Sequence, residues 1–165
     1  CYTAVLKAHI ALATTEFDAE TTGAQLDAIA RKPLKDEGLD YKHGTGHGVG
    51  HMLSVHEGPN TISPRGKNSH ILPGMITSNE PGVYIENKFG IRLENEILCT
   101  ERKDGRYAFE TITFCPFERE AILPELLTET EKAWLNAYHA RVYDTLKPLL
   151  STEEQVWLKA AASEI

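Results

Sequence analysis

Four glycines within the seven residues 44–50 place the strongest restriction on how this chain can fold. The stretch reads HGTGHGVG from His43 to Gly50, and a helix through it would cost ~1 kcal/mol at each glycine relative to alanine. We therefore expect a loop that leads into a strand and carries His43 and His47. Because glycine has no side chain, the backbone here can approach a ligand or metal closely.

Two helices are expected before this segment. The first occupies about residues 1–13, and its apolar positions at helical spacing are Val5, Leu6, Ile10 and Ala13. The second occupies about residues 22–37. Its apolar face is formed by Leu26, Ile29 and Ala30, and Gly38 suits its C-terminal end. Pro33 lacks a backbone donor, so this helix is expected to kink or end near Lys32.

After the glycine-rich segment the pattern changes to short strands and then returns to helices. Turn residues interrupt residues 41–113 at Pro81-Gly82, at Gly90 and at Asp104-Gly105, the last of which predicts a hairpin. Two capping boxes then mark helix starts, Thr128 with Glu131 and Ser151 with Glu154. The apolar stripe of the first helix is Trp134, Leu135, Tyr138 and Val142, and that of the second is Val156, Trp157 and Ala160. The order of helices, mainly antiparallel strands and helices predicts one domain of the α+β class.

Composition excludes several functions. The formal charge of −7 argues against nucleic acid or an anionic membrane as a partner, because both favour a basic surface. No apolar run reaches the length needed to span a membrane. The three cysteines are few and odd in number, which favours a reducing compartment over a disulfide framework. The helical pattern starts at Cys1 without a cap, and we therefore expect a piece of a longer polypeptide.

Three common motifs do not fit the histidine-rich stretch. A dinucleotide-binding G-x-G-x-x-G lacks its third glycine in either register, and no Gly-Lys-Ser/Thr follows to make a P-loop. His43 and His47 have the spacing of the zinc motif H-E-x-x-H, but Gly44 stands in place of the glutamate. Neutral imidazole remains a common metal ligand, whereas the simpler alternative is a set of hydrogen-bonded histidines in a turn.

Two carboxylates strengthen the metal hypothesis. Pro81 directs Glu80 toward an extended conformation at a strand end. In the strand GIRLEN, Arg92 and Glu94 are two residues apart and face the same side, although a solvated ion pair would look the same in sequence. One histidine with two carboxylates suits Mn²⁺ or Zn²⁺ better than copper or iron–sulfur chemistry.

Three longer stretches occur in the order HGTGHGVGHMLSVHEGP, MITSNEPGVYIENKFGIRLENEILC and YAFETITFCPF. Together they resemble the cytosolic Xaa-Pro aminopeptidase (aminopeptidase P) family of metallopeptidases, which have the pita-bread fold. Further similarity in YTAVLKAHIALA, LDAIAR and WLNAYHARVYDTL extends the resemblance over nearly the whole chain. The resemblance implies that residues 1–165 are the C-terminal part of a pita-bread catalytic domain with a curved, mainly antiparallel sheet.

The resemblance also implies a role for six residues. His47, Glu80 and Glu94 would be metal ligands, with Glu94 bridging two ions. His43 and His56 would line the substrate site and hydrogen-bond the peptide, Glu80 would also carry a proton, and Arg92 would position neighbouring acidic groups. The family needs two further aspartate ligands from an upstream hairpin, and the chain contains no match to that motif. At most one ion, weakly bound, is therefore expected in these residues alone.

The function implied for the full-length enzyme is removal of the N-terminal residue from peptides with proline in second position. It would use two divalent ions, Mn²⁺ before Zn²⁺, in a cytoplasmic homodimer, and the chain alone would be inactive. Two alternatives stay open: a pita-bread module that binds peptide or protein without catalysis, and a prolidase-type dipeptidase. The retained histidine and glutamates favour an enzyme, and the glycine-rich form of the histidine stretch favours the aminopeptidase.

Overall fold

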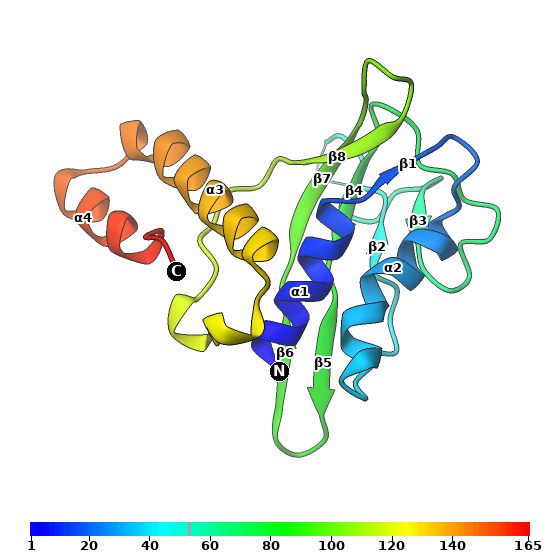
Figure 1. The fold of residues 1–165 in the computed structure, drawn as a ribbon. Helices are drawn as coiled ribbons and strands as arrows, with labels where there is room; N and C mark the ends of the chain where they lie inside the picture. Colours follow the sequence, from blue (N-terminus) through cyan, green and yellow to red (C-terminus); the bar gives the residue numbers. More distant parts are fainter. Residues whose placement is uncertain (53) are drawn as a thin grey trace. The chain divides into compact units, whose positions relative to one another are not determined.

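The computed structural model describes residues 1–52 and 54–165 (Figure 1). These residues form two compact units where the sequence indicated one domain. The first unit contains Cys1 and residues 3–113, and the second contains Tyr2 and residues 114–165. The division near residue 113 has no glycine- or serine-rich linker that would mark it in the sequence.

Helix α1 (Tyr2–Ala13) forms where the sequence predicts it, and its expected apolar positions are all buried. Helix α2 (Gly23–Asp36) begins at a capping box in which Thr22 and Gln25 bond each other's backbone N–H groups, a T-x-x-Q signal that the sequence analysis missed. Gly38 follows its end with a φ of +71°, as glycine after a helix commonly does.

Helix α2 continues through Pro33 to Asp36, so it does not end near Lys32, and the expected range of about residues 22–37 is confirmed. Proline lacks the N–H that would bond the carbonyl of Ile29, but Ile29 lies on the exposed side of the helix, where water can bond that carbonyl. Leu34, which follows the proline, is buried. Ile29 itself, expected on the apolar face, is 37% exposed, and the buried face follows Leu26, Ala30 and Leu34.

The central sheet of the first unit is antiparallel, with the strand order β1-β8-β7-β4. Its strands are β1 (Glu16–Phe17), β4 (Ile76–Asn79), β7 (Asn95–Glu101) and β8 (Tyr107–Thr111). β7 and β8 form the predicted hairpin, in which Gly105 has a φ of +82°. Asn79 pairs with Asn95 at one end of the β4–β7 ladder.

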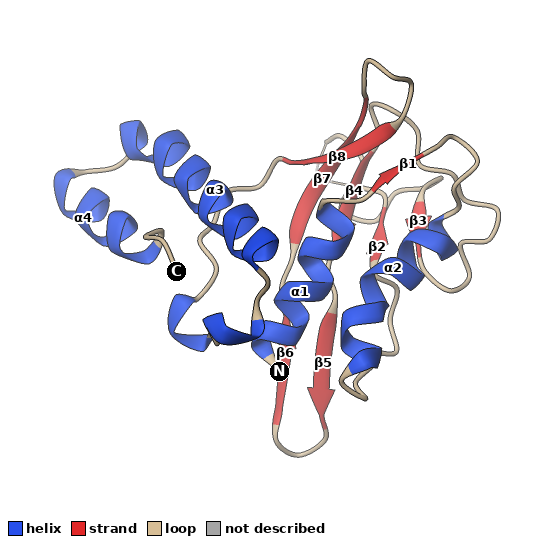
Figure 2. Ribbon diagram, in the orientation of Figure 1, coloured by secondary structure: helices blue, strands red, loops and turns tan. Residues whose placement is uncertain are grey.

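Two short antiparallel ladders accompany this sheet (Figure 2). One joins β2 (Gly46–His47) to β3 (Thr61–Ile62), so the glycine-rich segment is a loop and strand, as expected. The other joins β5 (Gly82–Ile85) to β6 (Phe89–Arg92). The sequence analysis placed a turn at Gly90, but Gly90 lies within β6, and Asn87 makes the turn with a φ of +58°.

The core of the first unit joins both helices to the sheet. Its buried members are Leu12, Phe17, Leu26, Ala30, Ile62, Ile71, Ile97 and Cys99. α1 also contacts the end of β4, where the Asn79 amide donates to the carbonyl of His9 at 3.0 Å. Strands β3 and β7 are therefore part of the packed core, and the end of β4 is attached to α1.

The second unit is helical, with α3 (Glu129–Leu146), α4 (Thr152–Ala161) and the short 3₁₀ helices η1 (Arg119–Ala121), η2 (Pro124–Leu126) and η3 (Lys147–Leu149). Both predicted capping boxes are present at the starts of α3 and α4. The stripe predicted for α4 is wrong, because Val156, Trp157 and Ala160 are exposed and Leu158 is buried instead. Among the described residues, no helix is both long and apolar enough to cross a membrane.

Candidate metal centre

Three side chains from separate elements meet in the first unit. His47 ends β2, Glu80 directly follows β4, and Glu94 lies between β6 and β7. The pairing of Asn79 with Asn95 explains how the two glutamates meet, because each is the chain neighbour of one member of that pair. Ligand atoms of His47, Glu80 and Glu94 all lie within 4.8 Å of one another. The sequence predicted one strand through GIRLEN, but Leu93 and Glu94 separate β6 from β7.

His47 and Glu80 present acceptor atoms to each other. Nδ1 of His47 lies 3.1 Å from the carbonyl of Gly48, and since a carbonyl only accepts, this nitrogen carries the ring proton. In the neutral ring Nε2 therefore presents a lone pair, and it lies 3.2 Å from Oε1 of Glu80. Two acceptors this close require a proton or a cation between them, so the donor set fits a divalent metal ion.

Neighbouring groups fix the Glu80 side chain and the backbone of both residues. Ser78 Oγ donates to Oε1 of Glu80 at 3.0 Å and accepts from the backbone N–H of His47 at 3.0 Å. The backbone N–H of Glu80 donates to the carbonyl of Thr45 at 2.8 Å. One serine thus orders a histidine and a carboxylate that lie 33 positions apart in the sequence.

The glycines beside His47 are required by contacts within the protein. A Cβ on Gly46 would lie 1.9 Å from the carbonyl oxygen of Ser78, and one on Gly48 would lie 1.9 Å from that of Glu57. The sequence analysis explained these glycines by the approach of a ligand or metal. The structure instead shows close approach to the chain's own backbone, which brings His47 against β4.

His56 and His43 make different contacts near this group. The ring of His56 is exposed and packs against the His47 ring, with centroids 4.2 Å apart. His43 is half-buried, and its Nδ1 lies 2.7 Å from the carbonyl of Gly44, so this nitrogen carries the proton. Its Nε2 lies 2.9 Å from the hydroxyl of Tyr84.

Arg92 contacts Glu80 instead of forming an isolated pair with Glu94. Its Nη1 lies 3.6 Å from Oε2 of Glu80, and its Nε donates to the Tyr84 hydroxyl at 2.9 Å. The pKa of Arg92 is raised, chiefly by this hydrogen bond to Tyr84. Because the Tyr84 oxygen accepts from Arg92, its own proton is free to point toward Nε2 of a neutral His43.

Tyr84 and Ser78 are the residues that the sequence analysis missed. Tyr84 pairs with Gly90 across β5–β6, and Gly82 pairs with Arg92, so the tyrosine and arginine are diagonal neighbours on one face. A Cβ on either glycine would lie within 3 Å of the tyrosine side chain. An aromatic residue flanked by glycines on paired strands is the signal that could have identified it.

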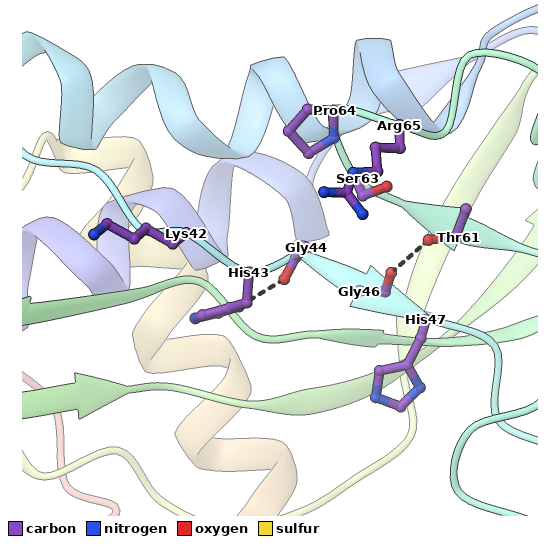
Figure 3. A pocket seen from close by; sticks show the side chains of 9 residues that line it. All are labelled: Lys42, His43, Gly44, Gly46, His47, Thr61, Ser63, Pro64 and Arg65. Atoms are coloured by element: carbon purple, nitrogen blue, oxygen red, sulfur yellow. Dashed lines mark hydrogen bonds between the residues drawn. The ribbon is translucent and has the colours of Figure 1, made fainter.

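A pocket of about 590 Å³ opens beside His43 and His47 (Figure 3). Its lining residues are Lys42, His43, Gly44, Gly46, His47, Thr61, Ser63, Pro64 and Arg65. Figure 3 shows His43 and His47 on one segment and Ser63, Pro64 and Arg65 across from it. The pocket can therefore admit a molecule to the histidine side of the candidate metal centre.

The sequence is similar to those of known metallopeptidases. Probable Xaa-Pro aminopeptidase P of Laccaria bicolor is 45% identical over 99% of this chain, and aminopeptidase P1 of Lotus japonicus is 46% identical over 100% of it. The matches cover 27% and 26% of those proteins, so the chain spans about a quarter of the length of these curated relatives.

Solved structures show the same fold. X-prolyl aminopeptidase from Caenorhabditis elegans, described as a cytosolic enzyme with a di-nuclear active site, matches 99% of this chain and 28% of its own with a TM-score of 0.91 and 39% identity. Prolidase from Pyrococcus furiosus matches 70% of this chain and 32% of its own with a TM-score of 0.61 and 32% identity. The expected α+β class and pita-bread fold are confirmed.

Family descriptions divide the chain close to the boundary of its two compact units. Metallopeptidase family M24 matches residues 1–101, and the C-terminal region of peptidase M24 matches residues 105–165. The matched part includes His47, Glu80 and Glu94, whose ligand atoms lie together. The chain belongs to metallopeptidase family M24.

Proposed function

We propose that this chain is the C-terminal part of the catalytic domain of a metalloaminopeptidase that removes the N-terminal residue from peptides with proline in second position. The observation that carries the proposal is the meeting of His47, Glu80 and Glu94 within 4.8 Å, beside a pocket that His43 also lines. The aminopeptidases P that match nearly the whole chain support this substrate class.

The proposed metal ligands are His47 through Nε2, Glu80 and Glu94, with Glu94 shared between two ions. Mn²⁺ is proposed before Zn²⁺, because two carboxylates and one imidazole form an oxygen-rich donor set. The di-nuclear active site of the C. elegans relative supports two ions. A bound divalent ion would polarise the scissile carbonyl and lower the pKa of its bound water to ~7.

Glu80 is the proposed proton carrier. Ser78 and Arg92 contact its two oxygens separately, so the carboxylate is held in one orientation. A carboxylate held in this way can take a proton from the attacking water and release it to the prolyl nitrogen as the peptide bond breaks. Arg92 acts in this scheme by positioning Glu80.

The two histidines have unequal roles in this proposal. In the neutral ring of His43, the proton on Nδ1 points to Gly44 and Nε2 faces Tyr84. The structure shows no hydrogen bond from the His56 ring to any other described residue, and the ring is exposed beside His47. His56 is therefore the proposed donor to charge that develops on the substrate, while His43 shapes the pocket wall.

Two other functions are less well supported. A prolidase-type dipeptidase fits less well. The structure of the P. furiosus prolidase matches 70% of this chain, whereas that of the C. elegans aminopeptidase matches 99%. A module that binds peptide without catalysis would have no need to keep three ligand atoms within 4.8 Å. For the whole protein we propose a cytoplasmic homodimer that acts on peptides.

The test uses the full-length protein that contains this chain, an Xaa-Pro-Xaa tripeptide and excess Mn²⁺. Release of the N-terminal residue is expected, together with its loss after chelation and in the variants Glu80→Gln and Glu94→Gln. Glu86→Gln is the matched control, since Glu86 is exposed and lies outside the three-residue group. Cleavage of Xaa-Pro dipeptides alone would favour the prolidase, and peptide binding without turnover would favour the binding module.

A further inference from the structure

A buried ion pair on α2 lies outside the candidate metal centre. Asp27 and Arg31 are one helical turn apart, their side chains are 3% and 5% exposed, and Arg31 Nε donates to Oδ2 of Asp27 at 2.7 Å. Charges removed from water in this way are costly unless their remaining hydrogen-bonding groups are also satisfied. The other partners of the pair therefore show what it holds.

Arg31 directs its remaining bonds to the segment that leads into the histidine stretch. Nη1 contacts the Asp40 carboxylate at 2.7 Å and the carbonyl of Tyr41 at 2.6 Å. Nη2 donates to the carbonyl of His43 at 2.6 Å. The guanidinium also lies 3.9 Å from the centre of the Tyr41 ring.

Asp27 continues the connection toward Glu80. Its Oδ1 accepts from the hydroxyl of Thr45 at 2.7 Å, and this hydroxyl also bonds that of Tyr41. The carbonyl of Thr45 accepts the backbone N–H of Glu80 at 2.8 Å. A continuous path of hydrogen bonds thus runs from α2 through residues 41–45 to a proposed metal ligand.

We propose that Asp27 and Arg31 are positioning residues that fix His43 and Glu80 in place for metal and peptide binding. The bonds that Arg31 makes beyond α2 go to residues 40–43, and the second oxygen of Asp27 bonds Thr45. A pair that served only to join α2 to the core would have no reason to bond this segment alone. Catalytic geometry is sensitive to displacements of about 1 Å, so loss of these bonds should weaken the site by displacing His43 and Glu80.

This inference rests on the proposed function for its effect on turnover, but its effect on metal affinity can be measured separately. The variants are Arg31→Lys, which keeps the charge and loses the planar fork, and Thr45→Val, which keeps the side-chain volume and loses the hydroxyl. Thr45→Ser restores the hydroxyl. Lys32→Met is the matched control, because Lys32 forms an exposed ion pair with Asp36 on the same helix at the same spacing.

Each variant is made in the full-length protein that contains this chain, and Mn²⁺ affinity, kcat and KM are measured. Arg31→Lys and Thr45→Val are expected to weaken Mn²⁺ binding and lower kcat by roughly 10- to 100-fold, the range for outer-shell partners of metal ligands. KM should change less than kcat, Thr45→Ser should recover most of the loss seen in Thr45→Val, and Lys32→Met should match the unmodified protein.

The inference is overturned if folded Thr45→Val, with an unchanged circular dichroism spectrum, keeps both Mn²⁺ affinity and kcat. Thr45→Val decides the matter if Arg31→Lys does not fold. If the unmodified protein binds Mn²⁺ but cleaves no Xaa-Pro peptide, the proposed function fails, while the difference in Mn²⁺ affinity between Thr45→Val and Thr45→Ser still tests the positioning role.

Discussion

Asn79 and Asn95 face each other across β4 and β7, and both contact His9 of α1. The Asn79 amide donates to the His9 carbonyl at 3.0 Å, and the Asn95 amide nitrogen lies 3.3 Å from His9 Nε2. Since an amide nitrogen only donates, Nε2 accepts, and this arrangement needs a ring nitrogen without a proton. A buried histidine thus lies beneath the strand ends that carry Glu80 and Glu94.

The first prediction concerns the pH dependence of stability. Burial lowers the pKa of His9 from 6.5 to about 4. Between these values the unfolded chain binds the proton more tightly, so the His9 contribution is present above about pH 6.5 and is lost as pH falls toward 4. From pH 7 to pH 5 the free energy of unfolding should fall by about 2 kcal/mol on this account.

Urea unfolding at both pH values, in the unmodified protein and in His9→Gln, measures this contribution. Glutamine does not titrate in this range, so the variant should lose about 2 kcal/mol less than the unmodified protein between pH 7 and pH 5. His139, whose pKa burial also lowers, remains in both proteins and cancels in the comparison. An equal loss in the two proteins would contradict the assignment.

The second prediction tests the contact between β2 and β4. In Gly46→Ala the new methyl group would lie 1.9 Å from the backbone carbonyl of Ser78, so the strands must separate. Overpacking of this kind typically costs 1–3 kcal/mol, and we expect about 2 kcal/mol or more together with weaker Mn²⁺ binding, because His47 is the next residue. Gly58→Ala, with nothing within 4 Å of its Cβ, is the control. Equal melting temperatures for the two variants would show that β2 can move freely.

The resemblance to a known family, and not local pattern alone, selects His47, Glu80 and Glu94 in the sequence. Taken by themselves, the histidines of HGTGHG could be hydrogen-bonded turn residues, and Arg92 with Glu94 could be a solvated ion pair. Their meeting depends on the β4–β7 register, which no single strand reveals.

Other features depend on tertiary partners that the sequence does not show. Asp27 reads as an ordinary helix residue, and nothing local indicates that it bonds Thr45, 18 residues away. On α4 the capping box correctly predicts the helix, but the buried position is Leu158 and not Trp157, because burial depends on what packs against the helix. Local rules therefore predict where a helix forms better than they predict which of its faces is buried.

The third prediction tests the proposed role of His56 as a hydrogen-bond donor to the substrate. His56→Ala should lower kcat for Xaa-Pro-Xaa cleavage by about 10²-fold, the usual effect of removing one donor to developing charge. His51→Ala is the control, since His51 is also exposed, whereas the ring of His56 packs against that of the proposed ligand His47. Steady-state kinetics of both variants in the full-length protein provide the measurement. An equal, small effect of the two substitutions would remove His56 from the proposed mechanism.

The last prediction concerns the 165 residues on their own. Among the described residues one group of ligands is present, and it contains His47, Glu80 and Glu94. A second ion would retain Glu94 as its one ligand from this group, and one carboxylate cannot hold a divalent ion against water. We therefore expect Mn²⁺ titration, followed by electron paramagnetic resonance, to give at most one weakly bound ion per chain, with no release of the N-terminal residue from an Xaa-Pro-Xaa peptide. Circular dichroism first establishes that the isolated chain is folded. Two bound ions, or turnover by a folded isolated chain, would show that residues other than these three complete the site.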